Sequence, residues 1–148
     1  LPMATLVTPN LPEMEALTAL PLSTYEEKER AARCLMDSGA QAILLKGGHE
    51  EGEVKTDILF SNSTTGIQST LFTSETVATR NIHGTGCTLS SAITAFLARG
   101  LALEEAIVEA KKYISNAIQS GADIAIGHGF GPVNHGFNPQ KMIVHETR

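Results

Sequence analysis

The sequence has no run of basic residues and no long apolar run. Its eleven Lys and Arg residues are scattered among sixteen Asp and Glu residues, which gives a net charge of −5. A nucleic-acid surface needs clustered cations, so none is expected. No apolar stretch reaches the roughly 18 residues that a membrane-spanning helix needs, so no membrane interaction is expected either.

Cysteine is scarce, and the sequence also lacks internal repeats and low-complexity segments. Only Cys34 and Cys87 are present, the first in a helix-like segment and the second in a glycine-rich turn. Two such cysteines do not resemble a disulfide framework. The sequence therefore predicts free thiols in the reducing environment of the cytoplasm.

What the sequence does have is the composition of a globular domain and an alternation of strand-like and helix-like segments. Hydrophobic residues make up 42% of the chain and charged residues 18%, as is usual for a chain that buries a core. Periodicity and turn residues predict, in order, a strand, two helices, a strand, a hairpin and two helices. These elements are expected at residues 4–8, 13–19, 24–38, 41–46, 55–61 with 66–72, 87–99 and 103–120. The order predicts an α/β fold with a central, largely parallel sheet flanked by helices.

The number of predicted strands is small for such a fold. Only three or four are visible, and a doubly wound sheet usually has more. The sequence also begins without Met, almost directly before a strand-like segment. We therefore expect the chain to be the second half of a longer domain, with the N-terminal half of the fold absent.

A glycine-rich turn with the sequence HGTGCT at 83–88 comes directly before a helix-like segment. Gly84 and Gly86 would let the backbone approach a ligand closely. The free N–H groups of the following helix could then face an anion, with help from the helix dipole. Cys87 would point into that site. A tight structural loop with an inert cysteine is the alternative, and a bare G-x-G pattern would favour it. The flanking His and Thr residues favour the phosphate site.

Two further segments lie at the C-terminal ends of predicted strands, where open α/β sheets bind their ligands. In the first, Asn10 and Glu13 are spaced so that a carboxamide and a carboxylate could hold a hydrated Mg²⁺. The alternative is a turn residue followed by a glutamate in the first turn of a helix. In the second, Lys46 ends a buried strand and could lean over phosphates. It could equally be a surface lysine whose stem covers apolar neighbours.

These segments together resemble a known family. TPNLPE at 8–13, KGGH at 46–49, HGTGCT at 83–88 and GPVNH at 131–135 occur in this order over nearly the whole chain. They are similar to the C-terminal half of hydroxymethylpyrimidine/phosphomethylpyrimidine kinase, a ribokinase-like enzyme. The glycine turn is the most specific element, because the wider superfamily usually has Asp where this chain has Cys87.

The resemblance implies ATP-dependent phosphorylation of 4-amino-5-hydroxymethyl-2-methylpyrimidine and then of its monophosphate, in thiamine diphosphate biosynthesis. The backbone at Gly84, Thr85 and Gly86 would form the anion hole for the transferring phosphoryl group. Cys87 would stand where the superfamily's base removes the hydroxyl proton. Lys46 resembles the lysine that contacts the ATP phosphates.

The cofactors that the resemblance implies are ATP and Mg²⁺. Asn10 and Glu13 resemble the N-x-x-E motif that organises Mg²⁺ and phosphate. The residues expected to bind ATP are Asn10, Glu13, Lys46, Gly48, Thr85 and Gly86.

As to partners, the resemblance implies a small-molecule substrate and a homodimer at full length. Residues 1–148 would be the C-terminal part of a single ribokinase-like kinase domain. They would carry mainly the ATP side and lack most of the pyrimidine pocket, so the isolated chain is expected to be inactive.

Two other functions stay open on the sequence. A pyridoxal or pyridoxine kinase has the same fold, and a bacterial subset has the same Cys-type turn. A non-catalytic nucleotide-binding module belongs to a different class. Intact Asn10, Glu13, Lys46 and Cys87 argue against the module, because sequence drift would have broken at least one of them.

Overall fold

The computed structural model describes residues 1–47, 54–64 and 66–139. The chain divides into two compact units, Leu1–Thr76 and Val77–Arg148.

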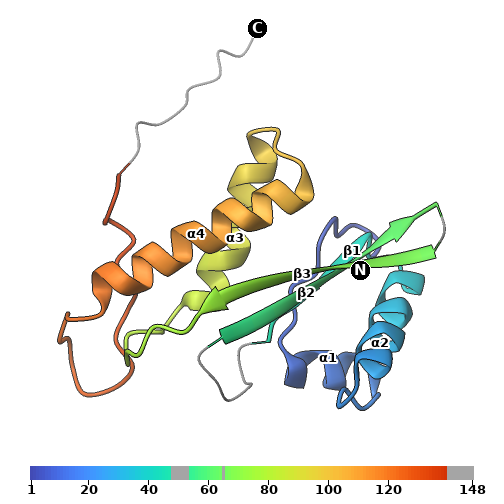
Figure 1. The fold of residues 1–148 in the computed structure, drawn as a ribbon, viewed down its shortest axis with the longest axis horizontal. Coiled ribbons are helices and arrows are strands. Elements are labelled where there is room, and N and C mark those ends of the chain that lie inside the picture. Colours follow the sequence, from blue (N-terminus) through green and yellow to red (C-terminus); the bar gives the residue numbers. More distant parts are fainter. Residues whose placement is uncertain (48–53, 65, 140–148) are drawn as a thin grey trace, which may run out of the picture. The chain divides into compact units, whose positions relative to one another are not determined.

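The first unit contains two helices and three strands (Figure 1). These are α1 (Leu11–Thr18), α2 (Tyr25–Asp37), β1 (Ala42–Leu45), β2 (Val54–Ser63) and β3 (Gly66–Glu75). All five elements agree with those predicted, although α1 begins two residues earlier and the hairpin strands are longer. Thr24 caps α2 through a reciprocal pair of hydrogen bonds with Glu27, as the sequence predicts for Ser23 or Thr24.

The three strands form a sheet in the order β1-β2-β3, and both pairings are antiparallel. The prediction of a largely parallel sheet is therefore wrong for the described strands. The connections are too short for the crossover of a dozen residues that parallel neighbours need. Within this unit, parallel pairing is limited to residues 4–10, which run beside β1 through isolated bridges from Val7 to Ile43 and from Asn10 to Lys46. The strand predicted at residues 4–8 is therefore wrong, because this segment forms bridges only. The helical segment α1–α2 provides the crossover for that one parallel pair.

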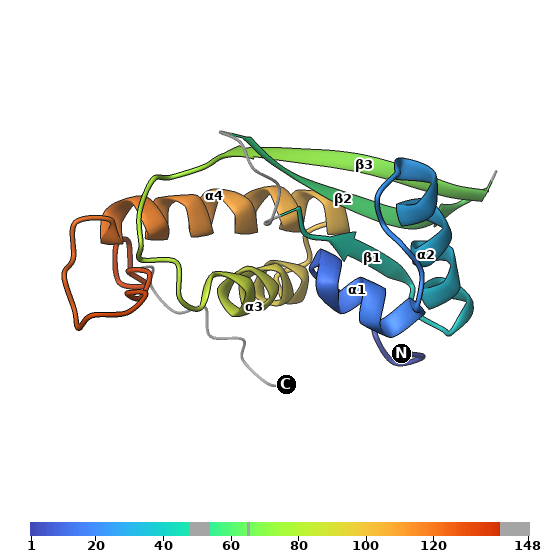
Figure 2. The same cartoon turned by 90° about the horizontal axis from the view of Figure 1, so that it is seen from below.

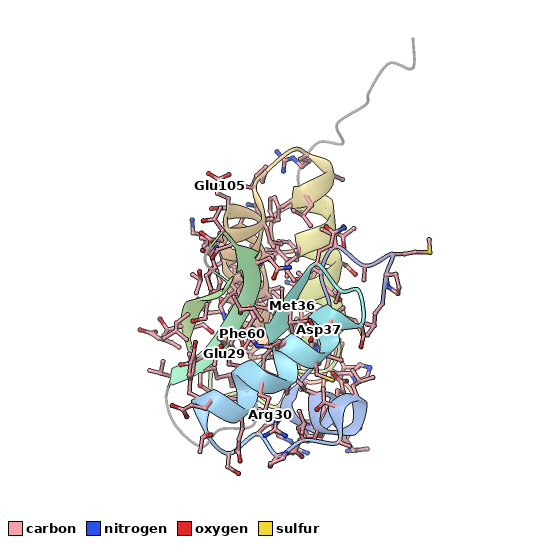
Figure 3. All side chains as sticks on the ribbon, turned by 90° about the vertical axis from the view of Figure 1, so that its right-hand side faces the viewer. Glu29, Arg30, Met36, Asp37, Phe60 and Glu105 are labelled. Carbon is pink, nitrogen blue, oxygen red and sulfur yellow. The ribbon has the colours of Figure 1, made fainter. Side chains whose placement is uncertain are left out.

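The core of this unit lies between the two helices and one face of the sheet (Figure 2). The register pairs Ile43 of β1 with Phe60 of β2, so both side chains point to the face that the helices cover. Met36 of α2 and Phe60 lie where helix and sheet meet (Figure 3). Helical spacing predicts that Ala31, Cys34, Leu35 and Ser38 face inward. Ala31 and Leu35 are buried, whereas Cys34 and Ser38 are exposed.

The second unit contains α3 (Thr85–Ala98) and α4 (Leu103–Gly121), which lie side by side (Figures 1 and 2). Their buried residues recur at helical spacing, as in Leu89 and Ile93 of α3 and Ile107 and Ile114 of α4. Among the described residues no helix is long and apolar enough to cross a membrane. Residues 127–136 contain no helix and no strand, but His83 and Pro132 form an isolated parallel bridge.

Candidate functional site

Asn10 and Glu13 form the capping box of α1. Asn10 Oδ1 accepts a hydrogen bond from Glu13 N at 2.8 Å, and Glu13 Oε2 accepts one from Asn10 N at 2.7 Å. Both side chains therefore satisfy backbone N–H groups at the helix start. Glu13 keeps its second carboxylate oxygen, Oε1, for which the described residues provide no hydrogen-bond donor.

Lys46 lies directly beside this cap. Its backbone N–H donates to Pro9 O at 2.9 Å, and it forms the parallel bridge with Asn10. The backbone of Lys46 thus lies beside the segment that carries Asn10 and leads into Glu13.

The turn after Lys46 is pressed against β2. A Cβ atom added to Gly47 would lie 1.9 Å from the carbonyl oxygen of Thr56, so only glycine fits there. The Gly47 N–H donates to Asp57 Oδ1 at 2.9 Å, and Asp57 is only 7% exposed. The buried Asp57 was missed from the sequence, where it looks like one polar residue in an alternating strand. Gly48, a predicted ATP-binding residue, lies outside the described residues.

The glycine turn opens α3 in the second unit. Gly84 is the N-cap residue and has φ +84°, a conformation that favours glycine. Thr85 N donates to Ile82 O at 3.2 Å, and Thr88 N donates to Gly84 O at 2.8 Å. Between them, the N–H groups of Gly86 and Cys87 have no acceptor among the described residues, and no side chain caps the helix.

This geometry would suit an anion. Two unpaired N–H groups at a helix start, with the positive end of the helix dipole, attract a negatively charged ligand. Cys87 is exposed and carries a free thiol on the same turn. The cysteine of this turn is therefore not buried, as the purely structural alternative would have it.

A cavity of about 710 Å³ lies in the same unit. It is lined by residues 78–81, which precede the glycine turn, and by residues 122–129, which follow α4. Apolar and polar groups both contribute, among them Ile124, Ile126 and Arg80. Arg80 donates from Nη2 to the carbonyl oxygen of His128 at 3.3 Å, which ties the two walls together.

The predicted site residues thus fall into two groups, one in each unit. Asn10, Glu13 and Lys46 come together in the first unit. The glycine turn with Cys87 lies in the second unit, beside the segment that lines the cavity. Within the described parts of the chain, no three His, Cys, Asp or Glu side chains are placed to hold a metal ion.

The fold is that of a ribokinase-like protein, and two backbone N–H groups of its glycine turn have no acceptor among the described residues. The family model described as "Phosphomethylpyrimidine kinase" matches residues 1–134. The chain therefore belongs to the phosphomethylpyrimidine kinase family.

Individual relatives agree with this assignment. The chain is 45% identical over 137 residues to the hydroxymethylpyrimidine/phosphomethylpyrimidine kinase of Staphylococcus aureus strain Mu50, covering 91% of the chain and 48% of that protein. It is 47% identical over 134 residues to the thiamine biosynthesis bifunctional protein ThiED of Geobacter sulfurreducens, covering 90% of the chain and 26% of that protein. The pyridoxal kinase of Staphylococcus aureus in complex with AMP-PCP is 36% identical, with a TM-score of 0.81 over 92% of the chain and 48% of that structure. The chain thus spans about half the length of the Staphylococcus aureus kinase that it matches.

Proposed function

We propose that the chain supplies the ATP side of a kinase for 4-amino-5-hydroxymethyl-2-methylpyrimidine and its monophosphate, in thiamine diphosphate biosynthesis. The observation that carries the proposal is the pair of unpaired N–H groups at Gly86 and Cys87, with the exposed Cys87 thiol on the same turn. The names of the relatives support the choice of substrate.

In the proposed reaction the glycine turn binds the transferring phosphoryl group. The backbone N–H groups of Gly86 and Cys87 would face its oxygens and stabilise the negative charge that they carry in the transition state. Cys87, as the thiolate, would accept the proton of the substrate hydroxyl. The freed alkoxide oxygen would bond to the γ-phosphorus while the bond to the β,γ-bridging oxygen breaks, and ADP would leave.

Lys46 and Glu13, the charged site residues of the first unit, would interact with the ATP phosphates. The Lys46 ammonium would offset the charge of the ATP phosphates. Asn10 Oδ1 and Glu13 Oε2 each already accept one backbone hydrogen bond, so Glu13 Oε1 is the oxygen of this pair without such a partner among the described residues. Glu13 Oε1 would hold a water of the hydrated ion, as Mg²⁺ keeps several of its waters in proteins. Asn10 would position Glu13 rather than bind the ion itself.

The cavity between residues 78–81 and 122–129 would receive the nucleoside of ATP. Its volume of about 710 Å³ lies within the range of sites for small ligands. Its wall belongs to the segment that leads into the glycine turn, so a nucleoside bound there would direct its phosphates toward the turn. The complex of the related pyridoxal kinase with the ATP analogue AMP-PCP is consistent with a nucleotide site in this fold.

The test measures kcat/KM for several alcohol substrates with the natural full-length polypeptide that contains these residues. We expect ATP-dependent phosphorylation of the hydroxymethylpyrimidine and its monophosphate with a higher kcat/KM than that of pyridoxal. Coupled measurement of ADP release gives all three values. A higher kcat/KM for pyridoxal would favour the second candidate, a pyridoxal kinase, which the structural likeness to such an enzyme supports. Release of no ADP with any of the alcohols would contradict both. The homodimer and the cytoplasmic location stay predictions.

The role of Glu13 has its own test, because α1 and α2 begin with equivalent capping boxes. Glu13→Gln keeps an acceptor for the cap but removes the charge, and a Glu or Gln serves equally in the box. We expect the Mg²⁺ concentration for half-maximal rate to rise several-fold, on the order of 0.5–1 kcal/mol of lost attraction, with an unchanged melting temperature.

The matched control is Glu27→Gln, which makes the same change in the box of α2. It should alter neither the Mg²⁺ dependence nor the melting temperature. Equal Mg²⁺ dependence for Glu13→Gln and wild type would show that Glu13 is a helix cap and nothing more.

A further inference from the structure

Asn81 lies three residues before Gly84, and the proposed function gives its side chain no role. It is only 6% exposed. Its Nδ2 donates to the carbonyl oxygens of Gly121 at 2.6 Å and of Ile124 at 2.7 Å, with a longer contact of 3.4 Å to Ala122 O. The side chain therefore binds the backbone where the chain leaves α4.

The other side of the Asn81 amide contacts Gly131. A Cβ atom at position 131 would lie 1.9 Å from Asn81 Oδ1 and 2.7 Å from its Cγ, so the amide packs directly on the glycine backbone. The carbonyl oxygen of Gly131 also accepts a hydrogen bond from His83 N at 3.1 Å. The segment 81–83 therefore also contacts the chain at Gly131.

These contacts close a loop. Residues 121–131, here called the α4 loop, leave the helix at Gly121 and return at Gly131, and one side chain contacts both ends. Most of the α4 loop lines the cavity of about 710 Å³, and Asn81 lines it too. The shape of the cavity therefore depends on the position of the Asn81 amide.

We propose that Asn81 is a positioning residue for the nucleotide, which fixes the α4 loop against the start of the glycine turn. This inference rests on the proposed function, in which the cavity receives the nucleoside and the turn receives the phosphates. Both parts must bind one molecule of ATP at the same time, so their separation must match its length. Asn81 sets that separation. It is connected to the turn by three residues of backbone, and it is connected to the α4 loop by its side-chain hydrogen bonds.

The chemistry explains why an asparagine stands at this position. An amide provides two N–H donors, and here they face a group of backbone carbonyl oxygens. Aspartate has the same shape but offers only acceptors when ionised, so its oxygens would repel these carbonyls in a buried place. The ends of the α4 loop would then separate.

Asn81→Asp in the natural full-length polypeptide is therefore the first test. We expect the KM for ATP to rise about tenfold or more, since the α4 end of the loop loses the buried hydrogen bonds of Gly121 and Ile124, worth on the order of a tenfold factor. The kcat and the KM for the pyrimidine alcohol should change less than about threefold, because the glycine turn and the alcohol site are retained. Asn116→Asp, the same change at an exposed position of α4, is the control and should leave all three constants unchanged.

Gly131→Ala tests the same contact from the other side and leaves the asparagine intact. The added methyl group would displace the Asn81 amide, so the KM for ATP should again rise while kcat changes little. Gly136→Ala is the control, because its Cβ would meet only Asn134 Oδ1 at an ordinary 3.6 Å. If Asn81→Asp does not fold, Gly131→Ala and Asn81→Ser provide the measurement.

The split between KM and kcat separates positioning from a purely structural role. Partial unfolding lowers the active fraction, and therefore kcat, but leaves the KM for ATP unchanged. An unchanged KM for ATP in folded Asn81→Asp and Gly131→Ala would overturn the inference, as would a loss of kcat alone. Calorimetric binding of ATP by the wild type distinguishes the two proposals. If the wild type binds ATP but transfers no phosphate, the kinase proposal fails and the dissociation constants of the variants still decide the role of Asn81. If it binds no ATP, both fail.

Discussion

Cys87→Ala is expected to lower kcat by about 10²-fold or more, the usual cost of removing a general base. The thiol stands on the first turn of α3, beside the two N–H groups that would bind the phosphoryl group. Alanine keeps those N–H groups and favours the helix. The KM for ATP should therefore change little, and the melting temperature should not fall. Steady-state kinetics of the natural full-length polypeptide with the pyrimidine alcohol give both constants.

The chain offers a matched control in Cys34, the other free and exposed cysteine. Cys34→Ala should leave the rate unchanged. Cys87→Asp should retain more activity than Cys87→Ala, because a carboxylate can also accept the hydroxyl proton. Equal turnover of Cys87→Ala and wild type would show that the glycine turn binds the phosphates without a base at position 87.

The start of α2 was predictable because it depends on local chemistry. Thr24 with Glu27 marks the start of α2 in the sequence as it does in the structure. Asn10 and Glu13 were harder to interpret, because the residues that cap a helix are the same types that bind Mg²⁺. The sequence favoured a helix start at residue 13, whereas the capping box places it at Leu11.

The direction of the sheet was predicted wrongly because the overall order of elements was given more weight than the connections. An α/β order is typical of parallel sheets, and residues 4–10 do run parallel to β1. The segment between Leu45 and Val54 is nevertheless too short for a helical crossover, so β1 and β2 pair antiparallel. The length of that segment was visible in the sequence.

The buried polar residues could not be predicted from the sequence. Asp57 and Asn81 stand in polar surroundings along the chain, and polar residues are usually exposed. Their burial follows from contacts with Gly47 and Gly131, which are 10 and 50 positions away. The sequence marks these two glycines only through the segments KGGH and GPVNH, which resemble the family. The structure adds the reason for glycine, because a Cβ atom at either position would collide with a neighbouring residue.

Lys46→Met is the second change for which we expect a large effect, a fall in kcat/KM of about 10²-fold, as for loss of one group that stabilises transition-state charge. Methionine keeps the apolar stem and removes only the ammonium. The fold depends on the backbone of Lys46, whose N–H donates to Pro9 O, and not on its charge. The melting temperature should therefore stay unchanged. Lys46→Arg should restore only part of the rate, since a planar guanidinium does not reproduce the compact charge of an ammonium.

Lys112→Met is the control for the loss of a positive charge. Lys112 is exposed on α4 and forms an ion pair with Glu109 at 2.6 Å, which contributes no more than about 0.5 kcal/mol on a helix surface. Its replacement should leave kcat/KM unchanged. If Lys46→Met also leaves kcat/KM unchanged, Lys46 is a surface lysine whose stem covers apolar neighbours, and Glu13 would be the remaining candidate of the first unit for contact with the nucleotide. A large fall with Lys46→Met alone would instead establish that the charge beside the Asn10–Glu13 cap takes part in phosphoryl transfer.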